Sequence, residues 1–443
     1  MEIIETAELL LRAHALCNHC LGRQFAMLGH GLSNEARGRA ILLLLVIEGS
    51  KRIHEGDDSG RNILWYAANH GFSKLAIKTL KSAGIIIKET EESCYLCGDV
   101  FKSLDELVLQ IIGKLSEFEV ESFLVGIKGS AKVEEKEDEL RVNFKLKWGE
   151  SIRNELSREI GKRIMKLIGK NVDFEHPNIL VLVNPFMKKI SLEVNPLFIF
   201  GKYRKLVRGI PQSKWICRQC KGKGCPNCAG TGKMYQDSVE EFISKPLLKK
   251  TKGRIAKLHA AGREDIDAKV LGSGRPFVIE VKKPKIWKID LEKLEEEINQ
   301  DADGKIEVNT LHWSSKEIVR NLKSSGQAAK VYRVLVEFEQ DISDKLIYKV
   351  LEGLIGKLIH QMTPSRVMHR RPLKLRKKRV YGIEFKRLKS NCIEMIIRCQ
   401  GGLYIKELLS GDDGRTTPSV SEICSIPAKC LEIDVISIEV GRL

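Results

Sequence analysis

This sequence contains no long apolar run, and we expect no secretory leader. The longest apolar stretch, residues 41–47, is far shorter than the ~20 residues that span a bilayer. The first ten residues, MEIIETAELL, are acidic and amphipathic, whereas a secretory signal is basic and then apolar. We therefore expect a cytoplasmic protein with no membrane partner, whose cysteines are reduced.

Acidic residues are scarce relative to basic ones. The 58 Asp and Glu residues stand against 75 Lys and Arg residues, which leaves a formal charge of +17 at pH 7. Solubility alone needs a smaller charge, so the excess indicates a polyanionic partner. Because nothing anchors the chain to a membrane, nucleic acid is the partner that we expect.

Four of the twelve cysteines form two widely separated pairs. Cys17 and Cys20 make one C-x-x-C, and Cys94 and Cys97 make another. Two such pairs complete a tetrahedral zinc site of four thiolates. The stretch between the pairs is too long for a compact zinc module, so we expect this site to clip together a folded helical domain.

A second group of cysteines is denser and more specific. Cys217, Cys220, Cys225 and Cys228 follow one another in CRQCKGKGCPNC, with glycines where a tight knuckle needs positive φ. Core packing does not explain four cysteines so close together, and no βαβ pattern suggests a redox dithiol. We expect a second structural zinc here. The remaining cysteines lack ligand spacing and are expected in the core: Cys392, Cys399, Cys424 and Cys430.

Hydrophobic periodicity predicts a mixture of helices and strands in a chain of 443 residues, which is too long for one core. A short tight turn, GSGRP at residues 272–276, is expected before the strand at 277–281. Helices are expected after the capping serines Ser33 and Ser73 and over residues 103–118, 151–170 and 291–300. Strands are expected at residues 123–127, 140–146, 179–183, 190–194, 277–281, 330–336 and 393–399.

Two basic segments suggest contact with RNA. Residues 195–211 interleave aromatic rings, which stack on bases, with cations that meet phosphates. A solvated basic face explains this segment equally well. Residues 361–379 form the densest basic run, and strand patterns on both sides predict a loop that grips phosphate. The cations of the first segment are Lys202, Arg204, Lys205 and Arg208.

A cluster of charges, REDIDAK at residues 263–269, lies directly before the GSGRP turn. A core would have to neutralise each charge, so the cluster suits a site. From the residues alone, three interpretations stay open. Asp267 with Glu280 and Lys282 imitates the D…E-x-K pattern of Mg²⁺-dependent nucleases. A single carboxylate with a basic partner would serve as a nucleophile. Zinc modules with basic loops would also suit a binding-only RNA adaptor.

Longer motifs carry a family resemblance. HAAGREDIDAKVLGSGRPF (259–277), QMTPSRVMHRR (361–371), GLYIKELLSGD (402–412) and NPLFIFGKYRKLVRGIPQ (195–212) resemble the archaeal and eukaryotic tRNA pseudouridine synthases of the "ten" family, which act on T-loop uridines. The resemblance runs nearly the full chain and includes a THUMP-like RNA-binding domain. It implies isomerisation of uridine 54, 55 or both to pseudouridine, on a base flipped out of its stack, with no catalytic cofactor.

The resemblance also assigns the reacting groups. The family's nucleophile falls on Asp265, two residues after Arg263, and Asp267 becomes a neighbour. Lys406 matches the basic residue that pairs with the nucleophile and keeps it ionised. Arg263 resembles the residue that helps hold the nucleotide out of the stack.

Further residues match the surroundings of the base. Tyr332 matches the tyrosine that stacks on the flipped uracil, and Leu408 matches a hydrophobic residue packed under the ring. The family's RNA-contacting loops match Arg275, Arg366, His369, Arg370 and Arg371.

We therefore expect an α+β protein with four parts. A zinc-clipped helical part covers residues 1–118, a THUMP-like RNA-binding domain 119–210, and the four-cysteine knuckle 211–236. A pseudouridine-synthase catalytic domain with a mixed, largely antiparallel sheet covers 237–443. The expected partner is the T arm of tRNA, bound by a monomer, and both zinc ions are expected to be structural only.

Overall fold

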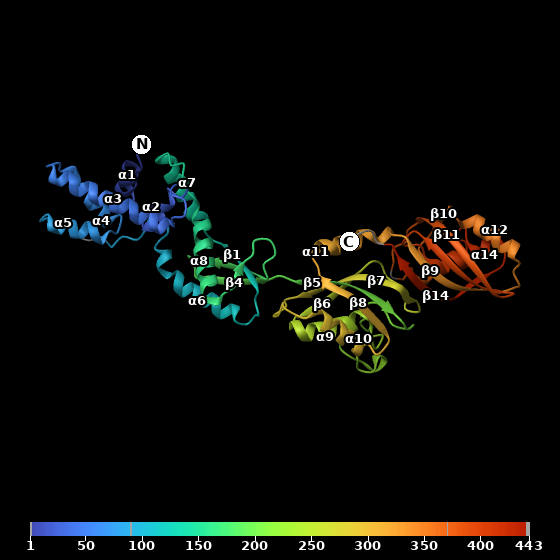
Figure 1. Ribbon diagram of the computed structural model, residues 1–443. Coiled ribbons are helices and arrows are strands. Elements are labelled where there is room, and N and C mark those ends of the chain that lie inside the picture. The colour runs from blue at the N-terminus through green and yellow to red at the C-terminus, as the bar shows by residue number, and fades with distance from the viewer. Residues whose placement is uncertain (1, 89–90, 370, 440–443) are drawn as a thin grey trace. The chain divides into compact units, whose positions relative to one another are not determined.

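The computed structural model describes residues 2–88, 91–369 and 371–439. It divides into two compact units, Met1–Asn195 and Pro196–Leu443, and each combines helices with one sheet (Figure 1). The α+β class expected from the sequence is confirmed. No helix in the described part of the chain has the length and apolar character needed to cross a membrane.

The first unit begins with a group of packed helices. Ser33 and Ser73 accept hydrogen bonds from the backbone N–H groups of Ala36 and Ala76, so both predicted N-caps are confirmed. The helices of this group are α1 (Ile3–Ala13), α2 (Asn18–Arg23), α3 (Asn34–His54), α4 (Ser59–Asn69) and α5 (Lys74–Ser82).

A four-stranded sheet forms the rest of this unit, in the order β2-β1-β3-β4. Its strands are β1 (Ser122–Ile127), β2 (Asn171–Val172), β3 (Ile179–Asn184) and β4 (Lys189–Val194), and the accompanying helices are α6 (Leu104–Leu115), α7 (Ala131–Asn143) and α8 (Ile152–Ile168). The short 3₁₀ turn η1 (Val100–Ser103) leads into α6.

Helix α8 follows directly from its sequence pattern. Ser151 caps it, and Gly169 ends it with a positive φ of 66°. Four members of the apolar stripe predicted for this helix are fully buried, Ile152, Leu156, Ile160 and Ile164, but the fifth, Leu167 in the last turn, is exposed.

The strand expected at residues 140–146 is wrong, because helix α7 runs through Asn143. The alternation in LRVNFKL resembles a strand, but the preceding AKVEEKEDE is rich in strong helix formers and extends the helix. A buried ion cluster fixes α7 in place. Arg23, fully buried, lies 2.6 Å from Glu137 of α7 and 2.7 Å from Glu155 of α8.

The second unit is built on a ten-stranded sheet in which all described pairings between named strands are antiparallel except β14 with β7. The order is β13-β10-β11-β12-β9-β14-β7-β5-β8, and β6 also pairs with β7. The strands are β5 (Leu197–Lys205), β6 (Ile255–Ala260), β7 (Lys269–Lys282), β8 (Ile306–Trp313), β9 (Lys330–Phe338), β10 (Leu358–Gln361), β11 (Arg376–Lys389), β12 (Cys392–Cys399), β13 (Thr416–Thr417) and β14 (Ala428–Ile438).

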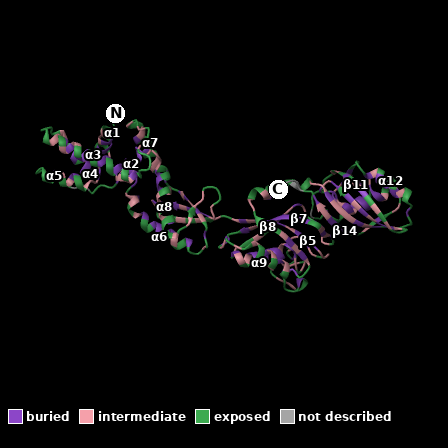
Figure 2. Ribbon diagram, in the orientation of Figure 1, coloured by how far each residue is buried: buried purple, intermediate pink, exposed green. Residues whose placement is uncertain are grey.

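Helices cover the two halves of this sheet separately. One set packs near β6 and β8, and another packs on β9, β12 and β14 around a core that includes Val334, Met395 and Leu408. Figure 2 shows the buried residues along the labelled strands and exposed residues on the outer helix faces. The helices are α9 (Val239–Thr251), α10 (Leu291–Asp301), α11 (Lys316–Ser324), α12 (Asp344–Leu354), α13 (Ile405–Ser410) and α14 (Val420–Cys424), with 3₁₀ turns η2 (Pro226–Cys228), η3 (Ser325–Gln327) and η4 (Ser365–Val367).

Strand β5 belongs to a different unit from the one that we expected. We expected residues 119–210 to form one RNA-binding domain, but β5 pairs with β7 and β8 of the second sheet, and the compact units meet after Asn195. The aromatic and aliphatic residues of β5 alternate with cations, and the sequence pattern alone does not say which sheet they pair with.

The turn expected at residues 272–276 is also wrong. Strand β7 runs unbroken from Lys269 to Lys282 and absorbs the glycines as an irregularity. Gly272 (φ 55°) and Gly274 (φ 75°) have left-handed backbones, which only glycine adopts without strain. A Cβ on Gly272 would lie 2.2 Å from the carbonyl oxygen of Ile436 in β14. The glycines therefore allow two strands to approach closely.

Candidate active site

A cavity of about 510 Å³ lies in the second unit where the REDIDAK cluster meets the ends of several strands. Its wall combines Asp265 from the segment before β7, Tyr332 from β9 and Ile433 from β14. Arg366 from η4 and Lys406 from α13 complete the part of the wall that carries charge. Segments more than 160 residues apart in the sequence thus converge on one acid.

Two cations approach Asp265. Arg366 Nη2 lies 2.9 Å from Asp265 Oδ2, and Lys406 Nζ lies 3.9 Å from the same oxygen. Arg366 also lies 2.6 Å from Glu407. Burial opposes the charge on Arg366, but these two carboxylates raise its pKa above the ordinary value. Asp265 is therefore flanked by two charged groups.

The expected pairing of Lys406 with Asp265 is only part of the arrangement. Lys406 Nζ lies closest to Asp267, at 2.5 Å from Oδ2. Burial raises the pKa of Asp267, but the hydrogen bond and charge of Lys406 outweigh it, so the pKa lies below the ordinary value. Lys406 thus bridges both acids, and Arg366 is the nearer partner of Asp265.

Tyr332 lies in the cavity wall as expected, and Leu408 does not. Burial raises the pKa of Tyr332 above its ordinary value, so the phenol is neutral at physiological pH. Leu408 is fully buried in the core under the sheet and is absent from the cavity wall. Leu408 belongs to the hydrophobic core against which Tyr332 packs, and its expected place under the ring stays a prediction. Ile433 and Val435 are aliphatic side chains that line the cavity from β14.

The end of β5 and the segment after it support the backbone of the acidic loop, residues 263–269. Lys205 Nζ donates to the carbonyls of Asp265 and Ile266 at 3.2 and 3.1 Å. The backbone N–H of Gly209 donates to Ile266 O at 2.9 Å, and Arg208 Nη1 donates to Asp267 O at 2.7 Å. These contacts hold the peptide units on both sides of Asp265.

Burial contradicts the RNA-binding role expected for Lys205. Its side chain is fully buried and also donates to Ile210 O at 2.8 Å. Arg208 is similarly engaged, with Asp434 at 2.8 Å, and Arg204 forms an ion pair with Glu307. Among the four cations of this segment, Lys202 alone has no bond or ion pair described within the chain's described residues. Three of these four cations therefore bind carbonyl or carboxylate groups of the protein itself.

Arg275 is a second correction. It lines the floor of the cavity but is 1% exposed, with Nε 3.0 Å from Glu264 Oε2 and Nη1 donating to Ala261 O at 2.7 Å. Glu264 also accepts from the Tyr203 hydroxyl at 2.9 Å. Arg275 thus neutralises a buried acid, which explains why it cannot reach out to a phosphate.

The basic run after β10 agrees in part with the loop that we expected. It contains η4, and Arg376 onward belongs to strand β11. Arg366 and Arg371 line the cavity, and His369 is exposed. Arg370 lies outside the described residues. The RNA-binding roles of these residues stay predictions.

The nuclease arrangement is not assembled. Glu280 lies 2.9 Å from His259, and neither Glu280 nor Lys282 belongs to the wall of the Asp265 cavity. Within the described ranges, the two groups of His, Cys, Asp or Glu that could hold a metal ion are both made of cysteines. Asp267 is therefore not part of a carboxylate metal site in this structure.

Comparison with known proteins is decisive on the family. A model of the Pus10 C-terminal region matches residues 198–439, and a model of the archaeal Pus10 THUMP domain matches residues 107–184. The tRNA pseudouridine synthase Pus10 of Methanothrix thermoacetophila is 37% identical over 439 residues, covering 99% of this chain and 94% of that protein. Its counterpart in Methanocaldococcus jannaschii is 42% identical, covering 100% and 96%.

This chain belongs to the Pus10 family. The resemblance inferred from the motifs is thereby confirmed. A solved complex of Cbf5, Nop10 and Gar1 contains a chain that is 14% identical with a TM-score of 0.30, over 53% of this chain and 47% of that one, a likeness too distant to support a conclusion.

The match to the archaeal Pus10 THUMP model shows that this chain contains a THUMP domain. A four-cysteine cluster precedes this domain in the same unit. The sulfur atoms of Cys17, Cys20, Cys94 and Cys97 lie within 4.8 Å of one another, with Cys17 and Cys97 3.7 Å apart. Zinc–sulfur bonds of about 2.3 Å separate tetrahedral ligands by about 3.8 Å. The cluster therefore has the dimensions of a metal site.

The second predicted cluster is equally compact. Sulfur–sulfur distances are 3.9 Å for Cys217 and Cys225, and 3.8 Å for Cys220 and Cys228. The backbone N–H of Gly224 donates to Cys220 Sγ at 3.2 Å. All twelve cysteines are free of disulfide bonds. Both groups of four can hold a metal ion.

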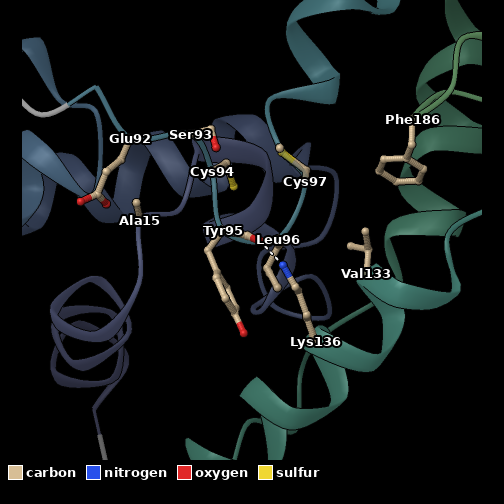
Figure 3. Close-up of a pocket in the computed structure, with 11 residues that line it drawn as sticks. Ala15, Glu92, Ser93, Cys94, Tyr95, Leu96, Cys97, Val133, Lys136 and Phe186 are labelled. Carbon is tan, nitrogen blue, oxygen red and sulfur yellow. Dashed lines mark hydrogen bonds between the residues drawn. The ribbon is translucent and has the colours of Figure 1, made fainter.

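A cavity of about 580 Å³ beside the first cluster contrasts with the Asp265 cavity (Figure 3). Its charged lining residues are Glu92 and Lys136, which balance. Lys136 Nζ lies 4.7 Å from the ring centre of Tyr95, and His14 stacks on that ring at 4.1 Å. Tyr95 is therefore engaged by two side chains of the protein itself.

Sequence reasoning missed several residues of the wall of the Asp265 cavity. Trp215, Lys330 and Ile433 line the cavity, and Gln212 donates to Gly262 O at 3.0 Å. Ile433 carries no chemical signal that distinguishes it from other strand residues. The burial of Lys205 had a signal in the sequence. Tyr203 and Lys205 lie two residues apart in β5, so their side chains point to the same face of the strand, and that face is buried.

Proposed function

We propose that this protein is a tRNA pseudouridine synthase that isomerises uridine 54, uridine 55 or both in the T loop. The observation that carries the proposal is Asp265 in the wall of a nucleotide-sized cavity, with Arg366 and Lys406 within 4.0 Å and Tyr332 in the same wall. Family membership supports the same activity, since the curated relatives are tRNA pseudouridine synthases by name.

The reaction needs only what this cavity contains. The N1–C1′ glycosidic bond breaks, the uracil rotates, a C5–C1′ bond forms, and the proton lost from C5 is balanced by one gained at N1. No electrons leave the substrate, so the protein has to supply a nucleophile, a place for the rotating ring and a route for one proton. An ionised carboxylate in a partly closed pocket is the required nucleophile.

In this proposal Asp265 is the nucleophile, and Arg366 and Lys406 place positive charge beside it. Tyr332 packs against the flipped uracil from one side, with Ile433 beside it. Arg263, whose guanidinium lies 5.2 Å from the Trp215 ring centre, helps to hold the nucleotide out of the stack. Unstacking costs a few kcal/mol, which these contacts offset.

The remaining roles concern the whole chain. We propose that the THUMP domain docks the tRNA and that both four-cysteine clusters hold structural zinc. We further propose a cytoplasmic monomer. Metal analysis of the purified protein tests the zinc, with about two ions per chain expected, and light scattering with and without tRNA tests the monomer.

The central test compares two neighbouring acids. Asp265→Asn removes the nucleophile while conserving shape, so pseudouridine formation in a tRNA transcript should be lost and tRNA affinity retained. Asp267→Asn is the matched control. It loses only the bond to Lys406, so activity should fall by a smaller factor. Pseudouridines are mapped by carbodiimide labelling and primer extension.

Two results would contradict this assignment. The first is normal turnover by Asp265→Asn, and the second is an inactive Asp267→Asn beside an active Asp265→Asn. The binding-only alternative predicts tRNA affinity without any pseudouridine from the wild-type protein. The nuclease alternative predicts cleavage of the transcript in Mg²⁺, so intact RNA rejects it.

A further inference from the structure

Lys330 is a buried lysine that faces the active-site cavity. It is the first residue of β9, two positions before Tyr332, so both side chains point to the same side of the sheet. Lys330 is 6% exposed and lines the cavity. Its ammonium lies beside Gly262, where an added Cβ would come within 2.6 Å of Nζ.

No counter-ion balances this ammonium within residues 2–88, 91–369 and 371–439, where Nζ has no described hydrogen bond or ion pair. The carboxylate whose charge acts on Lys330 is that of Glu264, and it is already paired with Arg275 at 3.0 Å and accepts a hydrogen bond from Tyr203. Cys399 of the neighbouring strand β12 pairs with Lys330, but burial raises the pKa of this thiol to about 12, so it is neutral.

The missing counter-ion has a physical cost. Burial, followed by the charge of Arg275, lowers the pKa of Lys330 to about 8. A buried charge without a partner is unfavourable unless something completes it. An anion entering the cavity would remove this cost, and a neutral ligand would not.

The rest of the wall favours an anion. Seven of the lining residues are Lys or Arg, and two are Asp or Glu. Glu264 and Asp265 each already face a cation, Arg275 and Arg366. The excess positive charge is therefore carried by residues that include Lys330, Arg371 and Arg376.

We propose that Lys330 is the anion subsite of this cavity and binds a backbone phosphate next to the flipped uridine. The inference rests on the proposed function for the identity of the nucleotide. The charge of the ligand follows from the cavity alone. A phosphodiester in this place would anchor the nucleotide on the side of the cavity where Gly262 leaves room, while the base extends to Asp265.

The test couples the lysine to one phosphate. T-arm RNAs are prepared with a neutral methylphosphonate in place of the phosphate on the 5′ or the 3′ side of the target uridine. Full-length wild type and Lys330→Met are compared for equilibrium binding. Lys330→Met should bind the unmodified RNA roughly ten- to hundred-fold more weakly, as expected for a charge-assisted hydrogen bond.

The diagnostic result is non-additivity. Methylphosphonate at one of the two positions should weaken wild-type binding by a similar factor and leave Lys330→Met unchanged. The exposed Lys349 of α12 supplies a control, since Lys349→Met should respond to methylphosphonate as the wild type does. If methylphosphonate at either position weakens RNA binding by Lys330→Met by the same factor as it weakens binding by the wild type, the proposal is overturned.

Stability provides a readout that a purely structural lysine would not give. Removing an unpaired buried charge should leave the melting temperature of Lys330→Met equal to or above that of the wild type, although RNA binding falls. A markedly lower melting temperature would contradict the unpaired state on which the proposal depends.

Two further arms separate the sources of failure. Inorganic phosphate at high concentration should stabilise the wild type and not Lys330→Met. If it does so but methylphosphonate has no effect at either position, the site takes free phosphate and the RNA assignment is overturned. The binding assays do not require turnover, so absence of pseudouridine from wild-type reactions would refute the proposed function separately.

Discussion

Asp265 owes its electrostatic surroundings to a single short helix. Helix α13 carries Lys406, which reaches Asp267 and Asp265, and Glu407, which holds Arg366 against Asp265. Two neighbouring residues of α13 thus supply one cation directly and position the other. Any shift of α13 would change both contacts together.

A prediction at the residue scale separates Leu408 from Ile433. Leu408→Ala should lower the free energy of unfolding by about 2–5 kcal/mol, because it opens a void in the core, and should leave turnover of the folded enzyme within a few-fold. Ile433→Ala alters the cavity wall and should reduce turnover more strongly. Chemical denaturation and single-turnover rates give the two values. A turnover loss larger for Leu408→Ala than for Ile433→Ala would restore the original sequence assignment.

The buried ammonium of Lys205 predicts a dependence of stability on pH. Burial lowers its pKa from 10.5 to about 8. Between these values the unfolded chain binds more protons than the folded one, so the free energy of unfolding should rise as pH increases from about 8 to 10.5. Lys205→Met should lack this gain.

The measurement is urea unfolding of both proteins across that pH window, with Lys202→Met as the control, since Lys202 lies on the same strand but is only half buried. Equal pH slopes for wild type and Lys205→Met would refute the prediction. Other groups that titrate in the window cancel in the difference between the two proteins.

At the scale of elements, the sheet depends on one close crossing. The two halves of the sheet join where β7 pairs with β14 in parallel, at Lys269 with Asp434 and Val270 with Val435. Gly272 lies directly beyond this pairing, against Ile436. The same crossing places Asp265 near Ile433, so the pairing supports the cavity.

We therefore expect Gly272→Ala to destabilise the second unit by about 2 kcal/mol or more, because it combines an unfavourable φ with a clash against the Ile436 carbonyl. Gly304→Ala is the matched control. Gly304 also has a positive φ, of 69°, but no atom lies within 4 Å of the added Cβ, so a cost of about 1 kcal/mol is expected. Thermal unfolding gives both values, and equal effects would show that the crossing tolerates a methyl group.

Helices and strands were predicted correctly where one hydrophobic period dominated the sequence. Examples are the apolar stripe of α8 and the apolar runs of β1, β3 and β12. It failed at residues 140–146, where helix propensity and strand alternation conflict, and at 272–276, where glycines mark a strand irregularity and not a turn. Local sequence does not record which distant strand approaches a glycine.

At the scale of the whole molecule, the boundary between units predicts which fragments fold. A fragment of residues 196–443 keeps β5 between β7 and β8 and should fold cooperatively. A fragment of residues 211–443, cut at the boundary that the sequence suggested, lacks that strand and the segment that supports the acidic loop. It should be insoluble or molten. Circular dichroism and thermal unfolding distinguish the two fragments, and a folded 211–443 would contradict the prediction.

The motifs named several residues that the fold brings into one cavity, but they did not show what each side chain contacts. Asp265, Tyr332 and Lys406 share a cavity, as expected. Lys205 and Arg275 looked like surface cations, yet the fold buries them against carbonyls and a carboxylate. A charge pattern cannot reveal whether its partner is a phosphate or the chain itself, because only the tertiary fold supplies the second half of each pair.

The hydrogen bonds that support the acidic loop have a practical consequence for anyone who transplants this chemistry to another scaffold. If residues 263–269 were transferred alone, their carbonyl groups would lack these hydrogen bonds, and the position of Asp265 would no longer be fixed. Residues 203–212 have to be transferred together with it, because their side chains donate the hydrogen bonds that fix the loop backbone. Both segments are therefore needed to reproduce the position of Asp265.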